Sequence, residues 1–298
     1  MLSNAGSGSE SQIIAGMEWA AEDVRAKVVS MSLGSQEASD GTDPMAQAVN
    51  TLSRDTGALF VIAAGNTGAP SIGSPGAADA ALTIGAVDSA DQVAYFSSQG
   101  PRLGDNALKP DLSAPGVDIL AARSQYTAGS GPYTAMSGTS MATLHVAGVA
   151  ALLAEEHPDW SGQRLKDALM STAKVLDAEP YALGAGRVDV PAATTASVTA
   201  TGSADLGFVR WPYGDDKPVT RTLTYTNSSD TAVRLTLSVD EARRRCRLPR
   251  RHRAHRPAHG TAHTTVTGDG THAAVGRTGG RVTASVDGSR WRTPRSSW

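Results

Sequence analysis

One stretch near the middle of the chain limits what the rest can fold into. Residues 137–153 read Ser-Gly-Thr-Ser-Met-Ala-Thr-Leu-His-Val-Ala-Gly-Val-Ala-Ala-Leu-Leu, so an apolar run follows Ser140 almost at once. From Val146 onward this run is apolar on every face of a helix. That pattern predicts a helix buried in the centre of a domain.

The start of this helix leaves two interpretations open for Thr139 and Ser140. Hydroxyl side chains are common helix caps, because they accept hydrogen bonds from the first free backbone N–H groups. A serine oxygen at the same place also faces unpaired N–H groups and the positive end of the helix dipole, which stabilise negative charge. The stretch by itself is therefore compatible with a structural cap or with a nucleophile.

Helical and strand patterns alternate through the first two-thirds of the chain. Apolar residues recur at helical spacing over 13–24 and 45–54, and 58–64 is an uninterrupted apolar run typical of a buried parallel strand. Further strands are predicted over 26–34, 80–87 and 118–122, the last as the final strand of the sheet. We therefore expect an α/β domain over 1–195, with a mostly parallel sheet flanked by helices.

Composition limits the possible partners and compartments. A chain of 298 residues with 40% hydrophobic and 19% charged residues and a net charge of −2 indicates no general attraction to nucleic acid or anionic membranes. The single cysteine, Cys246, excludes an intrachain disulfide. No apolar run is long enough for a membrane span. Residues 1–12 lack the basic and apolar regions of a secretion signal.

Residues 138–148 closely resemble the nucleophile motif of the subtilisin-like serine peptidases, or subtilases. The family motif runs Gly-Thr-Ser-Met-Ala, a small residue, then Pro-His-Val-Ala-Gly, and Leu144 is the one departure because it stands at the proline. Proline fixes φ at a helix start, so its absence relaxes the first turn without touching the serine. The resemblance implies that Ser140 is the nucleophile of a peptidase that acts on polypeptides.

Two more segments carry site residues by this resemblance. Asn66, after Ala63, Ala64 and Gly65, stands where the family has its oxyanion-hole asparagine, and its amide would act together with the Ser140 backbone N–H. The alternative for Asn66 is a turn residue before Gly68. Ser32, Leu33 and Gly34 are similar to the family strand that pairs with substrate backbone, the alternative being an ordinary strand end. The substrate-binding residues implied are Ser32, Leu33, Gly34, Ala63, Ala64 and Gly65.

The resemblance covers about residues 9–193 and implies a secreted protein. Residues 109–116 resemble the loop before the last strand, an ordered turn because of its prolines. Residues 183–189 resemble the end of the catalytic domain. No organic cofactor is implied and no metal ligand is assigned, since a structural calcium ion known in relatives has no identifiable site here.

The proton acceptor that a nucleophilic serine needs is missing from this pattern. The family order is Asp, His, Ser, yet no histidine precedes Ser140. We therefore expect the sequence to open inside a catalytic domain, after both partners, and to have little activity by itself. His145, His157 and the 259–263 segment His-Gly-Thr-Ala-His are not expected to act as the base, and Lys27 offers no clear pairing with serine.

Two other functional classes remain open. One is a non-catalytic remnant or a peptide-binding module that uses the substrate strand alone. The other is an α/β-hydrolase, in which His157 with Asp177 or Asp189 would follow the serine. That fold needs Gly-x-Ser-x-Gly, however, and Ala142 stands at the last glycine.

The remaining residues, 196–298, have β-strand patterns. Alternation over 221–226 and 233–239 around an Asn-Ser-Ser-Asp break predicts a β-hairpin, and 282–286 before Asp287-Gly288 predicts another. This resembles the fibronectin-type β-sandwich domains appended to many large subtilases.

A basic loop near 241–258 would bind nucleic acid or stay solvated and disordered. We favour the second, because no aromatic residues are interleaved with its arginines.

Overall fold

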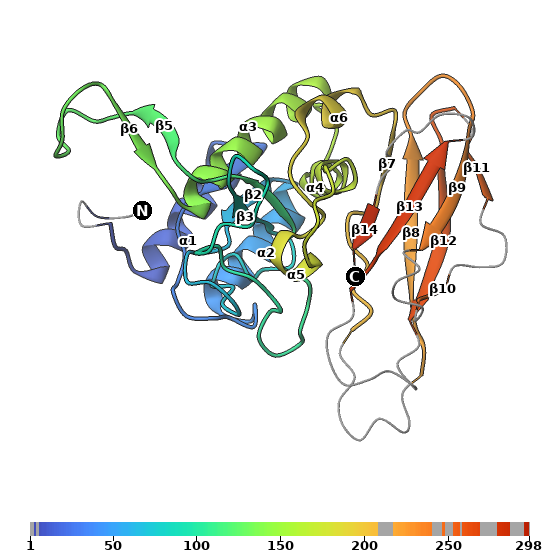
Figure 1. Cartoon of the computed structure of the whole chain (residues 1–298), viewed down its shortest axis with the longest axis horizontal. Helices are drawn as coiled ribbons and strands as arrows, with labels where there is room; N and C mark the ends of the chain where they lie inside the picture. The colour runs from blue at the N-terminus through green and yellow to red at the C-terminus, as the bar shows by residue number, and fades with distance from the viewer. Residues whose placement is uncertain are drawn as a thin grey trace.

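The computed structural model describes residues 3, 6–207, 217–239, 246–247, 253–256, 258–268, 279–286 and 295–297. Figure 1 shows a helix-and-sheet part, a long two-stranded arm that projects from it, and a part made of strands. The helix-and-sheet part contains α1 (Glu10–Glu18), η1 (Trp19–Asp23), β1 (Val28–Met31), α2 (Pro44–Thr56), β2 (Leu59–Ala63), β3 (Leu82–Val87), β4 (Leu112–Pro115), β5 (Ile119–Ala122), β6 (Tyr133–Met136), α3 (Thr139–Glu156), α4 (Gly162–Ser171), α5 (Pro180–Leu183) and α6 (Val190–Thr195).

The core of this part is a four-stranded parallel sheet in the order β1-β2-β3-β4. All five residues of β2 are buried, as the uninterrupted apolar run predicts. Leu59 and Val61 face a core shared with α3 and α4, whereas Phe60 and Ile62 face a core shared with α1, η1 and α2. Helices therefore cover both faces of the sheet, and the predicted α/β architecture is confirmed.

Local signals place the helix ends. Ser9 forms a capping box with Gln12 at the start of α1. Asp43 caps α2 ahead of Pro44, and Gly57 ends that helix with φ of 74°. The helices predicted over 13–24 and 45–54 are confirmed, the first continuing as a turn of π-helix.

The end of the sheet differs from the prediction. The last sheet strand is β4, in the segment predicted to be a turn, because prolines at the ends of a short strand leave its ladder intact. The strand predicted over 118–122 exists as β5, but it pairs antiparallel with β6 and forms the arm. The prediction that 118–122 completes the parallel sheet is therefore wrong.

The central helix is buried on one face only. Ala142, Val146, Ala150 and Leu153 are fully buried against the sheet, and we call these residues the inner face of α3. Leu144, Gly148, Ala151 and Leu152 are exposed, and we call them the outer face of α3. The prediction of a helix buried all round is wrong for the part of the chain that the structure describes.

A buried ionic cluster lies next to the start of β4. Asp111 Oδ2 lies 2.7 Å from Lys109 Nζ, and Asp111 Oδ1 lies 3.2 Å from Lys166 Nζ. Burial lowers the pKa of Lys109 to about 8. Burial alone would raise the pKa of Asp111, but Lys109 and Lys166 hold it below its ordinary value.

The strands after α6 form two antiparallel sheets around one core. Leu223 and Tyr225 of one sheet and Leu235 and Leu237 of the other are all buried in this core. The strands are β7 (Val198–Ala200), β8 (Val219–Asn227), β9 (Val233–Val239), β10 (Cys246–Arg247), β11 (Arg253–Arg256), β12 (Thr261–Gly268), β13 (Arg281–Val286) and β14 (Arg295–Ser297), in the orders β10-β12-β8-β7 and β11-β9-β13-β14. This is the sandwich-like all-β architecture that the alternating patterns predict.

The first predicted hairpin is wrong in its pairing. The strands β8 and β9 exist, but β8 pairs with β12 and β7, and β9 pairs with β11 and β13. The connection crosses between the sheets because both strands turn their apolar face to the shared core. The second predicted hairpin corresponds to β13 and β14, which pair antiparallel, while its Asp287-Gly288 turn lies outside the described residues.

The basic segment is only partly described. Within 241–258, β10 and β11 pair with β12 and β9, so two strands interrupt the expected continuous loop. The remaining residues of the basic run lie outside the described residues.

The β sheets join the helix-and-sheet part at α4. Ala200 N donates to Ser171 Oγ over 3.2 Å, and Gly202 N donates to Asp167 Oδ1 over 2.9 Å. Burial raises the pKa of Asp167. A side chain at Gly202 would collide with Met170, so the chain passes α4 in close contact.

Candidate active site

The predicted site residues meet at one edge of the sheet. Ser32, Leu33 and Gly34 follow the carboxyl end of β1, and Ala64, Gly65 and Asn66 follow the carboxyl end of β2. The amino terminus of α3 brings Ser140 to both. Clefts in open α/β sheets form at this edge, where parallel strands end.

Ser140 stands in the first turn of α3 and does not cap it. The cap residue is Gly138, and no side chain caps the helix, so the cap interpretation of Thr139 and Ser140 is wrong. Ser140 Oγ lies 3.5 Å from the carbonyl oxygen of Ser32. In return, Ser32 Oγ donates to the carbonyl oxygen of Ser140 over 3.0 Å, which ties β1 to α3.

Asn66 is held next to the start of α3 by Thr139. Its Oδ1 accepts hydrogen bonds from the Thr139 backbone N, at 2.9 Å, and from Thr139 Oγ1, at 3.0 Å. These bonds hold the amide oxygen of Asn66 against Thr139. A methyl group at Gly138 would lie 3.6 Å from Asn66 Nδ2 and 3.7 Å from the Ser140 backbone N. The two nitrogen atoms are therefore both close to Gly138, at the start of α3.

The role of Thr139 was missed by sequence reasoning. Its hydroxyl was interpreted as a possible cap, but it lies buried against Gly65 and Asn66. No spacing rule distinguishes the two uses, because both place a threonine directly at a helix start.

Behind Asn66, three hydroxyl side chains support its loop. Ser98 Oγ accepts from Thr67 N and lies 3.1 Å from Ser71 Oγ, and Thr67 Oγ1 lies 2.7 Å from Ser71 Oγ. Gly65 has φ of 110°, and a Cβ there would lie 2.8 Å from Ser98 Oγ. Gly65 therefore has a steric and a conformational reason to be glycine.

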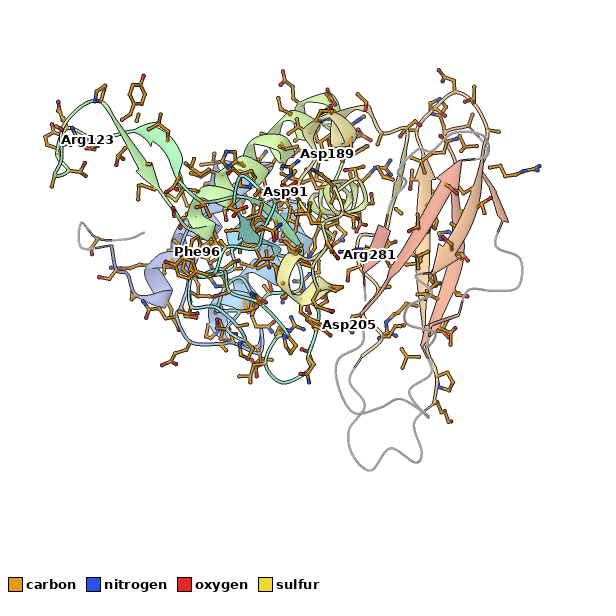
Figure 2. All side chains as sticks on the ribbon, viewed as in Figure 1. Asp91, Phe96, Arg123, Asp189, Asp205 and Arg281 are labelled. Atoms are coloured by element: carbon orange, nitrogen blue, oxygen red, sulfur yellow. The ribbon has the colours of Figure 1, made fainter. Side chains whose placement is uncertain are left out.

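The loop is also paired through its backbone. Gly68 N donates to Phe96 O over 2.9 Å, and Ser71 N donates to Gln99 O over 3.0 Å. Figure 2 places Phe96 in the body of the helix-and-sheet part, away from Arg123 in the arm. Asn66 is thus presented by a loop anchored on both sides.

The segments after β1 and β2 are joined beyond the opening. Ser35 N donates to Ser74 O over 2.7 Å, and Ser74 N donates to Ser35 Oγ over 2.9 Å. Ala38 and Gly73 form an antiparallel bridge. Gly34 packs so closely on Ser74 that an added Cβ would lie 3.0 Å from its carbonyl oxygen.

Within the described ranges, no histidine or carboxylate lies within hydrogen-bonding distance of Ser140 Oγ. His145 Nδ1 lies 3.0 Å from Met141 O, and His157 is at the far end of α3, about 25 Å along the helix. His259 pairs with Asp230 at 2.7 Å, in the β sheets.

The other candidate partners also have different roles. Asp189 caps α6 by accepting from Ala192 N, and Lys27 Nζ donates to Pro158 O over 2.9 Å. His157 stacks on Trp160 with ring centroids 3.9 Å apart. The α/β-hydrolase order of His157 with Asp189 is therefore not assembled.

The described residues were compared with the requirements of a metal site and of a membrane span. No group of three or more His, Cys, Asp or Glu side chains in them could hold a metal ion. None of their helices is both long and apolar enough to cross a membrane.

A family profile described as "Subtilase family" matches residues 1–206. The chain belongs to the subtilase family. Among curated subtilases, it is 40% identical over 194 residues to alkaline elastase YaB of Bacillus sp. (strain YaB), covering 65% of this chain and 47% of the relative. It is 39% identical over 197 residues to subtilisin of Bacillus pumilus, covering 65% of each chain. Subtilisin Savinase of Lederbergia lenta is 39% identical over 194 residues, again with 65% of each chain covered.

The matched region, residues 1–206, includes the segments that carry the candidate site. It contains the segments after β1 and β2 and the start of α3. The chain spans about half to two-thirds of the length of these relatives. Family membership thus supports hydrolysis of polypeptides by a serine as the family activity, and the role of each residue is a separate question.

Proposed function

We propose that this chain carries the nucleophile and the oxyanion-binding half of a serine endopeptidase. One observation carries the proposal: Asn66 Nδ2 and the Ser140 backbone N lie 3.6 Å and 3.7 Å from the position that a Cβ atom on Gly138 would take. Donors fixed in this way stabilise negative charge on a carbonyl oxygen, which is where charge develops in acyl transfer.

The proposed reaction proceeds through an ester on Ser140. Ser140 Oγ attacks the peptide carbonyl carbon and loses its proton to a base, and the carbonyl oxygen becomes an oxyanion between the two N–H groups. The C–N bond then breaks, the leaving amine takes the proton, and water hydrolyses the ester to regenerate serine.

The substrate would bind along the two strand ends. We assign Ser32, Leu33 and Gly34 as a strand that pairs with extended substrate backbone. We assign Ala63, Ala64 and Gly65 to the opposite wall, where the small size of these residues would leave room for a substrate side chain.

Turnover by this chain alone is expected to be very slow. Ser140 Oγ faces the Ser32 carbonyl, which is a poor proton acceptor. In subtilisins themselves, loss of the catalytic base costs on the order of 10⁶ in kcat, and we carry that magnitude over from the family. Some residual rate would remain from oxyanion stabilisation and binding.

The second candidate function is a peptide-binding module without chemistry. The observation that favours it is the same contact of Ser140 Oγ with a backbone carbonyl rather than with an imidazole. In that case Ser32, Leu33 and Gly34 would bind extended peptide and Ser140 would only close the strand end.

The setting of the site is part of the proposal. We place the boundary of the peptidase part at residues 195–196, between α6 and β7, and assign the fibronectin-like β sheets a spacing or docking role. Secretion, known for related enzymes, is proposed for the whole protein by resemblance.

A fluorophosphonate probe separates the two candidates. Prolonged incubation at high probe concentration should phosphonylate Ser140, as read by peptide mass spectrometry, and Ser140→Ala should abolish the adduct. Ser137→Ala is the matched control, because Ser137 is an exposed hydroxyl that contacts Asp118 instead. Binding of extended peptides with no adduct at Ser140 would favour the module and refute the peptidase proposal.

A further inference from the structure

We propose that Asp43 is a positioning residue for the segments that would bind extended peptide. Its carboxylate binds Ser39, in the segment after β1, and Ser74, in the segment after β2, and so sets the spacing between them. The effect on substrate rests on the proposed function, whereas the contacts of Asp43 are independent of it.

The carboxylate of Asp43 accepts hydrogen bonds from three places. Ser39 Oγ donates to Asp43 Oδ2 over 2.5 Å, and Ser74 Oγ donates to Asp43 Oδ1. Ala46 N also donates to Asp43 Oδ1, over 3.1 Å, at the start of α2. Burial alone would raise the pKa of Asp43, but these hydrogen bonds hold it below its ordinary value. The side chain is therefore a charged acceptor at neutral pH, and hydrogen bonds to a charged acceptor are stronger than neutral ones.

Capping of α2 accounts for only one of these bonds. A capping side chain accepts from a backbone N–H in the first turn, which Ala46 N provides. The two hydroxyl bonds come from outside the helix, and Ser74 lies 31 residues further along the chain than Asp43. The Ser39 hydroxyl also accepts from Gly41 N over 2.9 Å, so it is held from both sides. Asp43 thus joins two segments that the sequence separates.

The two segments also pair through their backbones. Ser39 N donates to Ile72 O over 2.9 Å, and Ser35 N donates to Ser74 O over 2.7 Å. Ser74 is only 5% exposed. The hydroxyl bonds to Asp43 therefore tie this short antiparallel pairing to the start of α2.

The position of Ser74 affects the proposed substrate strand through Gly34. An added Cβ at Gly34 would lie 3.0 Å from Ser74 O, so the two segments are in contact without spare room. Ser140, by contrast, is tied to Ser32, at the other end of the segment after β1. A change at Asp43 should therefore disturb the binding of extended peptide more than the reactivity of Ser140 itself.

Two phosphonate probes of different size separate these effects. An ethyl fluorophosphonate contacts Ser140 and little else, whereas succinyl-tetraalanine diphenyl phosphonate also occupies the proposed peptide-binding segments. Asp43→Ser keeps a cap for α2 but is too short to reach both Ser39 and Ser74, and Ser74→Ala leaves the cap intact. In each variant, labelling of Ser140 by the peptidyl phosphonate should slow about tenfold, and labelling by the fluorophosphonate should slow less than about twofold.

A double variant and amide hydrogen exchange make the test specific. Because both substitutions remove the same contact, Asp43→Ser combined with Ser74→Ala should be no slower than the slower single variant. Exchange at the Ser35 amide, which donates to Ser74 O, should be about tenfold faster in each variant. Asp189→Ser is the matched control, because Asp189 caps α6 by accepting from Ala192 N over 3.1 Å, and it should change none of these rates.

Each outcome decides the role of Asp43. Equal slowing with both probes, slowing with neither, or the same effects in Asp189→Ser would overturn it. Unchanged exchange at Ser35 would show that Asp43 does not set the spacing of the two segments. Faster exchange at Ser35 in the variants of a chain that neither probe labels keeps Asp43 as the residue that spaces the segments, and contradicts the proposed function of Ser140.

Discussion

The two sides of Ser140 are built to different degrees. On one side, Asn66 is fixed by Thr139 and by an anchored loop, and both Asn66 Nδ2 and the Ser140 backbone N lie close to Gly138. On the other side, Ser140 Oγ contacts a backbone carbonyl oxygen, and among the described residues the outer face of α3 is exposed and β1 pairs with β2 alone. Under the proposed function, oxyanion stabilisation would come from local elements of this chain, whereas the described residues place no base next to Ser140.

The comparison is tested most strongly at Asn66. Asn66→Leu removes the donor, and Asn66→Asp removes it while keeping an acceptor for Thr139. Both should slow phosphonylation of Ser140 by about 10²–10³, a magnitude taken from the subtilisins themselves. The rate is measured by timed mass spectrometry, with circular dichroism as the folding control. Unchanged rates in both variants would remove Asn66 from the site.

The two faces of α3 should differ in their effect on stability. Leu153→Ala, on the inner face, should lower the free energy of unfolding by about 3 kcal/mol, because it leaves a cavity in the core. Leu152→Ala, on the outer face, should cost less than about 1 kcal/mol, since its side chain is already exposed in the chain alone. Urea unfolding of both variants makes the measurement. Equal losses would mean that the outer face is already covered.

The buried ionic cluster around Lys109 should make the free energy of unfolding depend on pH. The pKa of Lys109 is lowered to about 8 by burial, from 10.5. Between these values the folded chain holds fewer protons than the unfolded chain, so the Lys109 contribution makes the free energy of unfolding rise with pH. The rise should be about 3 kcal/mol at most.

Urea titrations between pH 7.5 and 10.5 measure this slope. Lys109→Met is the comparison variant, because it removes the titrating group and should lose the rise. A slope that survives in Lys109→Met assigns the effect to another group.

The smallest expected effect is at Thr139. Thr139→Val removes the hydroxyl that contacts Asn66 Oδ1 and keeps the backbone N–H bond to the same oxygen. Loss of one hydrogen bond of about 1 kcal/mol should slow phosphonylation roughly fivefold. Thr143→Val, whose hydroxyl bonds within α3, is the control and should leave the rate unchanged. Equal rates in both variants would show that the backbone bond alone holds Asn66.

Much of the fold was predictable because its signals are local. The buried run of β2 and the amphipathic pattern of α2 each specify an element without reference to the rest of the chain. The pairing of β5 with β6 and the pairing of β8 with β7 were not predictable. The choice between sheets depends on the partner strands and not on alternation within one strand.

The site divides in a similar way. The resemblance points to Ser140 and Asn66, and in the structure the Ser140 backbone N and Asn66 Nδ2 both lie close to Gly138. The part played by Thr139, and the hydroxyl group of Ser98 behind Gly65, depend on contacts between segments more than 30 residues apart. The apolar run from Val146 predicts a helix buried on every face, and the exposure of Leu144 and Leu152 could be seen only with the neighbouring elements in place.

The most direct measurement is a crystal structure of the chain phosphonylated at Ser140. The account predicts that the phosphoryl oxygen accepts hydrogen bonds from both Asn66 Nδ2 and the Ser140 backbone N, at about 2.7–3.1 Å. A phosphoryl oxygen that points to solvent, with Asn66 turned away, would contradict it.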